Sequence, residues 1–104
     1  MGDVNSDPAD PGPHGTAFDV LAAAGLADTW VQANGATPGF THGFGERLDD
    51  PDTTGVNTRI DHVLTRRAAA PASKAKLTGL DADNRTPSRL WPSDYAGLVT
   101  TLFP

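Results

Sequence analysis

The alternation of apolar and polar positions changes along this chain and predicts both strands and a helix. Residues 59–65 alternate, placing Ile60, His62 and Leu64 on one face and Asp61 on the other, so we predict a strand there. After a turn at residues 68–72, residues 73–80 are expected to return as an antiparallel partner of that strand. The apolar run 96–103 predicts a final strand that is largely buried.

The first half of the chain is punctuated by glycine and proline, which predicts loops around one short helix. Thr16 is a plausible N-cap for a helix over residues 17–24, with Gly25 just past its end. The helix is followed by a segment leading back to the core, and the remaining connections are expected to be irregular. The segments concerned are a strand end and loop at 1–6, a loop at 7–15, the returning segment at 26–30, and the irregular stretches 32–58 and 81–92.

The composition describes one small domain with a thin core. Leu, Ile, Val and Phe together number 20 of 104 residues, and glycine and proline number 11 and 9, so the chain is expected to be a loop-rich α/β piece that folds poorly alone. No apolar run is long enough to span a membrane, and the start lacks the pattern of a secretion signal. There is no cysteine, which excludes disulfides and thiolate metal sites and fits either the cytoplasm or the exterior.

The net charge of −5 argues against a basic clamp on duplex DNA. The same charge is compatible with a metal-dependent nuclease, because the carboxylates that bind divalent metals are themselves acidic.

Near the start, Asp3 and Asn5 lie two residues apart at a predicted strand end, so their side chains project to one side. Hydrolysis of a phosphoester needs a deprotonated water and a group that stabilises charge on the phosphate oxygens. An aspartate beside an asparagine supplies both. The structural alternative is an ordinary polar turn.

Two further aspartates have both a functional and a structural interpretation. Asp61 lies inside a predicted strand, where a carboxylate needs a partner, either the neighbouring Arg59 or a catalytic group. Asp94 opens the last strand, either as a metal contact beside Ser93 or as a turn residue after a proline.

The aromatic, histidine and arginine residues carry weaker signals. His62 is expected to be a packed core histidine and Trp30 a core residue, whereas His14 and His42 are expected to be solvated in loops. Trp91 either lines a substrate groove or anchors its loop. Arg85 and Arg89 flank the loop leading to Asp94, where they either contact phosphate or face solvent.

Three motifs occur in a specific order: Gly2-Asp3-Val4-Asn5, then Arg59-Ile60-Asp61, then Ser93-Asp94-Tyr95. This order resembles the second half of the endonuclease/exonuclease/phosphatase family of metal-dependent phosphoesterases, with a tyrosine, Tyr95, where the family has its catalytic histidine. The stretch 90–99, with Gly39-Phe40-Thr41 upstream, looks like a bacterial subgroup of that family.

The resemblance implies that residues 1–104 form a single incomplete domain, an α+β C-terminal portion of a four-layer sandwich in which two packed mixed sheets are flanked by helices. The missing first half would be a partner of this chain, together with a phosphate-ester substrate from among nucleic acids, lipid head groups and sugar phosphates. The implied reaction is hydrolysis of a phosphodiester or phosphomonoester by an activated water, with Mg²⁺ or Mn²⁺ as cofactor. The alternative is a non-catalytic remnant or binding module that kept the fold.

The resemblance also assigns roles to individual residues. Asp3 and Asn5 would serve both catalysis and metal binding, Asp94 would contact the metal, and Asp61 would orient the residue at position 95. Tyr95 keeps the shape of the family's histidine and stays neutral near pH 7, because the pKa of a tyrosine is ordinarily about 10. Substrate contacts are expected from Trp91, Arg85 and Arg89.

Overall fold

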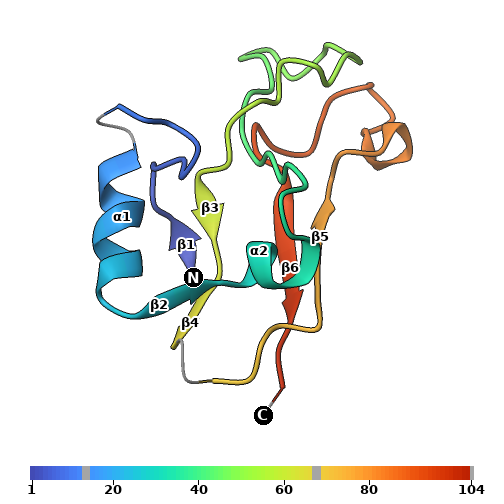
Figure 1. Ribbon diagram of the computed structural model, residues 1–104. Coiled ribbons are helices and arrows are strands. Elements are labelled where there is room, and N and C mark those ends of the chain that lie inside the picture. The colour runs from blue at the N-terminus through green and yellow to red at the C-terminus, as the bar shows by residue number, and fades with distance from the viewer. Residues whose placement is uncertain (13–14, 67–68, 104) are drawn as a thin grey trace.

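A computed structural model describes residues 1–12, 15–66 and 69–103 (Figure 1). The described chain is a small α+β domain in which each sheet is antiparallel and two-stranded. Helices α1 (Thr16–Ala23) and α2 (Thr29–Asn34) are joined by the short strand β2 (Leu26–Asp28). The other strands are β1 (Gly2–Asp3), β3 (Asp61–His62), β4 (Leu64–Arg66), β5 (Lys74–Thr78) and β6 (Gly97–Thr101).

The strand predicted over residues 59–65 is present, but it is divided at Val63. Its first part, β3, pairs with β1, and its second part, β4, pairs with β2. The break has a local cause, because the Val63 carbonyl accepts hydrogen bonds from the Thr29 backbone N–H at 3.1 Å and the Thr29 hydroxyl at 2.8 Å. The Val63 carbonyl is therefore hydrogen-bonded to Thr29, the first residue of α2.

The partner predicted for residues 73–80 was wrong. Strand β5 pairs along its whole length with β6, from Lys74 opposite Thr101 to Thr78 opposite Gly97. One face of this ribbon lies against α2, where the Thr29 and Thr100 hydroxyls are 3.2 Å apart. The other face is exposed, and Val99 is 46% exposed. The last strand is consequently half-buried and not largely buried as predicted.

Helix α1 confirms the helix predicted after residue 16, but its first turn is capped differently. Thr16 is already helical, and Gly15 is the N-cap and provides no side-chain hydrogen bond. Instead the distant Ser6 hydroxyl accepts the Phe18 N–H at 3.0 Å. Helix α2 was not predicted, and it begins where the Asp28 carboxylate accepts the Trp30 N–H at 2.9 Å. A short 3-10 helix, η2 (Ala82–Asn84), interrupts the later irregular stretch. Within the described residues, no helix has the length or apolar character to cross a membrane.

The long irregular connections gather at one end of the molecule (Figure 1). There the side chains of Phe44, Val56 and Trp91 form a buried cluster. Trp91 is 3% exposed, and its indole N–H donates to the Asp50 carbonyl at 2.6 Å. The stretches 32–58 and 81–92 are largely irregular, as predicted, but they pack on each other through this tryptophan.

A polar cluster is buried on the opposite side of β3 from Asp61. Asp28 Oδ2 lies 2.6 Å from Arg59 Nη1, with both side chains about nine-tenths buried. Arg59 Nη1 also lies 3.2 Å from His62 Nδ1, and His62 Nε2 lies 2.8 Å from the Ser6 carbonyl. Because arginine only donates, His62 Nδ1 accepts and its Nε2–H donates to Ser6. The predictions that His62 and Trp30 are buried are confirmed, at 2% and 6% exposure.

Candidate functional site

Three segments that are distant in the sequence meet at the ends of β1 and β6. Asp3 in β1 and Asp61 in β3 are directly opposite each other in the strand pair. The Tyr95 hydroxyl, 92 residues from Asp3 in the sequence, donates to Asp3 Oδ2 at 3.1 Å. The structure therefore brings Asp3, Asp61 and Tyr95 to one place.

The turn after β1 holds Asp3 and Asn5 together. The Asn5 backbone N–H donates to Asp3 Oδ1 at 2.9 Å, and Asn5 has a φ of 51°. Asparagine tolerates this left-handed conformation better than most residues, which explains its use in such turns. Each carboxylate oxygen of Asp3 thus accepts a hydrogen bond, one from Asn5 and one from Tyr95.

The segment before β6 places Asp94 beside Tyr95. The Ser93 hydroxyl accepts the Tyr95 N–H at 3.1 Å and lies 3.4 Å from Asp94 Oδ1. Ser93 therefore braces this loop. Asp94 itself is exposed.

Thr41 connects this last segment to β3. The Thr41 side chain is fully buried, and its hydroxyl accepts the N–H groups of Ile60 and Asp61, each at 3.3 Å. The Thr41 carbonyl accepts the Ala96 N–H at 2.8 Å. One buried threonine therefore helps fix the distance between Asp61 and the Asp94–Tyr95 segment.

The surroundings of Tyr95 raise the pKa of its hydroxyl above the ordinary value. Burial is the main cause, followed by the hydrogen bond to Asp3 and by the negative charges of Asp3, Asp61 and Asp94. Tyr95 is therefore neutral throughout the physiological range. The Tyr95 hydroxyl contacts the Asp3 carboxylate. Asp61, which was predicted to orient the residue at position 95, acts on Tyr95 only through its negative charge.

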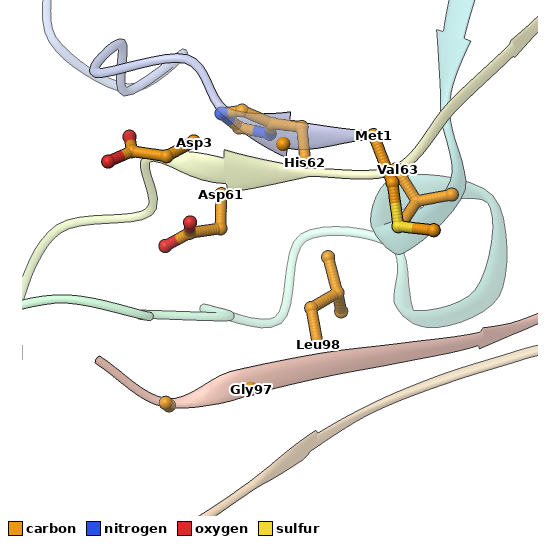
Figure 2. Close-up of a pocket in the computed structure, with 9 residues that line it drawn as sticks. Met1, Asp3, Asp61, His62, Val63, Gly97 and Leu98 are labelled. Atoms are coloured by element: carbon orange, nitrogen blue, oxygen red, sulfur yellow. The ribbon is translucent and has the colours of Figure 1, made fainter. Parts of the chain in front are cut away.

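Asp61 points into a cavity of about 190 Å³ between the β1–β3 pair and β6 (Figure 2). One end of this cavity carries the carboxylates of Asp3 and Asp61, and the other carries the side chains of Met1, Val63 and Leu98. Asp61 Oδ2 is buried and has no hydrogen-bond partner among the described residues. A buried carboxylate oxygen without a partner is costly, so this position favours a bound cation.

None of the three residues predicted to contact substrate lines this cavity. Trp91 is buried in the loop cluster, which favours the anchoring interpretation. The Arg85 guanidinium stacks 5.6 Å from the Trp91 ring and donates to the carbonyls of Asp49 and Arg89. Arg89 is exposed and has a φ of 62°. Arg85 thus helps to hold the two loops together.

His42 was predicted to be solvated in a loop, but it is half-buried against Tyr95. Its imidazole lies 4.9 Å from the Tyr95 ring, centroid to centroid, and its backbone bridges both Thr58 and Tyr95. A histidine in a glycine-rich loop carries no periodic signal, so only its place next to the Gly39-Phe40-Thr41 motif could have drawn attention to it. His14 lies outside the described residues.

With this geometry established, the chain was compared with known proteins. It matches no known protein family, no curated protein sequence and no solved structure. What the site can do therefore follows from its own atoms.

The residues present supply some, but not all, of the ligands that a hard divalent cation needs. Asp3 and Asp61 are like charges directly opposite each other on paired strands, an unfavourable arrangement that a cation relieves. Oxygen ligands of this kind suit Mg²⁺ and Mn²⁺. Among residues 1–12, 15–66 and 69–103, however, no three histidine or acidic side chains are grouped closely enough to hold a metal ion by themselves. Mg²⁺ commonly binds one or two carboxylates and completes its shell with water and substrate phosphate.

Proposed function

We propose that this chain carries part of the active site of a Mg²⁺-dependent phosphoesterase. The observation that carries the proposal is the hydrogen bond from Tyr95 to Asp3, because it unites the segments of all three motifs at one place. Two carboxylates face each other there, an asparagine stands beside them, and a third aspartate adjoins the tyrosine. Water activation and phosphate binding need groups of these types.

Each residue has a role in this proposal. Asp3 accepts the proton of the attacking water, and the Asn5 amide donates to a phosphate oxygen. Asp3, Asn5 and Asp94 would hold the metal ion, which would supply positive charge to the phosphate oxygens. Asp61, directly opposite Asp3 on the paired strand, adds a second negative charge that attracts the metal ion. Tyr95 fixes the orientation of the Asp3 carboxylate through its hydroxyl.

We propose that the complete fold contains more strands than the described elements. Three two-stranded ribbons with free edges suit a domain in which further strands extend each sheet. We propose that these strands belong to the first half of a four-layer sandwich, present either upstream or on a partner chain. That half would also contribute the remaining ligands of the metal.

The second candidate function is a non-catalytic binding module. It is favoured by Tyr95, whose raised pKa keeps it uncharged where the resemblance expects a histidine able to carry a proton. Such a module would retain the carboxylates and bind a cation or a substrate without turnover.

The test is a pair of measurements on the purified chain: Mg²⁺ binding by titration calorimetry, and hydrolysis of bis(p-nitrophenyl) phosphate. We expect Mg²⁺ to bind and Asp3→Asn to abolish that binding, while hydrolysis by the chain alone stays at background. An exposed control, Asp83→Asn, should bind as the unmodified chain does. Absence of Mg²⁺ binding would contradict the proposal. Rapid Mg²⁺-dependent turnover lost in Asp3→Ala would show that this chain is a complete catalyst.

A further inference from the structure

Another cavity, of about 340 Å³, adjoins the candidate site and takes no part in the roles assigned above. Its lining side chains are Asn5, Asp7, Asp10, His42, Thr58 and Ile60. The cavity shares Asn5 with the site, and its His42 ring packs on Tyr95. A phosphate held by the Asn5 amide would therefore have the rest of its ester next to this cavity.

We propose that this cavity binds the organic group of the phosphate ester and that this group is a polyol. The inference rests on the proposed function for its connection to phosphate, but the binding of the polyol itself needs neither metal nor hydrolysis. Its volume lies in the range typical of small-ligand sites.

The acidic wall of the cavity is held in place by backbone hydrogen bonds. Asp7 accepts the Ala9 N–H at 2.9 Å with one oxygen and the Arg59 N–H at 3.0 Å with the other. Asp10 accepts the Gly12 N–H at 2.7 Å through Oδ1. Each carboxylate oxygen has more than one lone pair, so these oxygens can accept further hydrogen bonds from a ligand. A wall fixed in this way loses little entropy when a ligand binds.

The charge of the wall decides which part of a substrate it can accept. Asp7 and Asp10 are both acidic, and the part of the chain that the structure describes contributes no lysine or arginine to the lining. A phosphate group would be repelled there. The phosphate therefore belongs with Asn5 and the metal, and the cavity suits the part of the ester that carries hydrogen-bond donors.

The remaining groups favour hydroxyls over an ammonium group. Among the described residues, the Asn5 amide makes no side-chain hydrogen bond, and His42 Nδ1 has only a long contact of 3.4 Å to the Thr58 hydroxyl. Amide, imidazole and hydroxyl groups both donate and accept, which matches a ligand hydroxyl, whereas an ammonium group only donates. A quaternary ammonium is recognised by several aromatic faces, whereas His42 supplies the one ring among the described residues that line the cavity.

The experiment is an NMR titration of the ¹⁵N-labelled chain with myo-inositol, without metal, with choline and inorganic phosphate in parallel. We expect myo-inositol to shift the amide signals of Asn5, His42 and Thr58 saturably, with a dissociation constant of about 1 mM, as befits a small neutral ligand. Asp10→Asn and His42→Gln should each weaken binding by about tenfold, the value of one hydrogen bond to a charged or well-placed group. Lys76→Gln, on the exposed face of β5, should leave it unchanged.

Three outcomes would overturn the inference. Choline shifting these signals while myo-inositol does not would assign the cavity to a cationic group. Binding that survives both Asp10→Asn and His42→Gln, in variants whose spectra remain dispersed, would place the ligand elsewhere. If no probe causes a saturable shift, the cavity is not a binding site for any of these ligands. Polyol binding by a chain that binds no Mg²⁺ would leave this inference standing and overturn the proposed function instead.

Discussion

Two groups of charged side chains lie on opposite sides of strand β3, and they differ in how their charges are balanced. On one side Asp28 and Arg59 form a buried ion pair, and Arg59 also donates to the ring of the buried His62. On the other side Asp3, Asp61 and Asp94 make no ion pair within the described residues. The first group therefore has a structural role that needs no ligand. The second is an unbalanced negative charge, which proteins retain where something from outside supplies the opposite charge.

The largest effect should come from breaking the balanced group. Arg59→Ala leaves the Asp28 carboxylate buried without a counter-charge, so we expect the free energy of unfolding to fall by about 3–5 kcal/mol. Urea denaturation followed by tryptophan fluorescence measures this change. The matched control is Arg47→Ala, which removes an exposed ion pair with Asp49 at 3.4 Å and should cost at most about 1 kcal/mol. Equal effects of the two substitutions would refute the distinction between the two sides.

A smaller effect should follow from loosening the connection between β3 and the last segment. Thr41→Val keeps the shape of the side chain but leaves the N–H groups of Ile60 and Asp61 without their acceptor. We expect a loss of about 1–3 kcal/mol in the free energy of unfolding. Hydrogen exchange should become faster at Ile60 and Asp61 and stay unchanged at Leu77 in β5; uniform acceleration would argue against a local role.

Removing a charge from the group of Asp3, Asp61 and Asp94 should stabilise the folded chain, whereas the two substitutions above destabilise it. In the absence of divalent metal, Asp61→Asn removes one of two like charges on paired strands, so we expect the chain to become more stable by about 0.2–1 kcal/mol. Thermal unfolding in the presence of a chelator measures this. Asp83→Asn, at an exposed position of the short 3-10 helix η2 (Ala82–Asn84), serves as the control and should have no effect. If Asp61→Asn destabilises the chain, the Asp61 carboxylate has a partner within the protein. The inference that it favours a bound cation would then be wrong.

The smallest effect concerns the titration of Tyr95, the single tyrosine in the chain. Because the folded-state pKa lies above the unfolded value, the neutral phenol contributes stability that is present below about pH 10 and is lost as pH rises through the folded pKa. The near-ultraviolet absorbance of tyrosinate reports this pKa directly. In Asp3→Asn the pKa should move down, since a charge and a charged acceptor are removed together. An unchanged titration would show that the hydrogen bond to Asp3 does not form in solution.

Local patterns predicted some features well. The helix after residue 16, the buried His62 and Trp30, and the irregular stretches all follow from short-range periodicity and turn residues. The pairing of β5 with β6 and the division of β3 from β4 did not, because both depend on contacts between distant segments, such as Thr29 with Val63. Helix α2 was missed because six residues give too short a periodic signal.

The candidate site shows the same division. Asp3, Asn5 and Asp61 were identified from their types and their order in the chain, and the strand pairing places Asp3 opposite Asp61. That Tyr95 donates to Asp3 could not be derived, since it depends on how β6 approaches β1. Likewise His42 and the cavity beside it arise from the packing of residues 5–10 against residues 42–60, which no sequence pattern encodes.

The most direct test of the account is the effect of Mg²⁺ on thermal unfolding of the unmodified chain and of Asp3→Asn. A cation that binds only the folded state at a hundred times its dissociation constant adds about 2.7 kcal/mol of stability. At roughly 4–8 °C per kcal/mol for a domain of this size, the unmodified chain should melt roughly 11–22 °C higher with saturating Mg²⁺. Asp3→Asn should show almost no such increase. An increase of equal size in both proteins, or in neither, would contradict the central claim that these carboxylates form a cation-binding site.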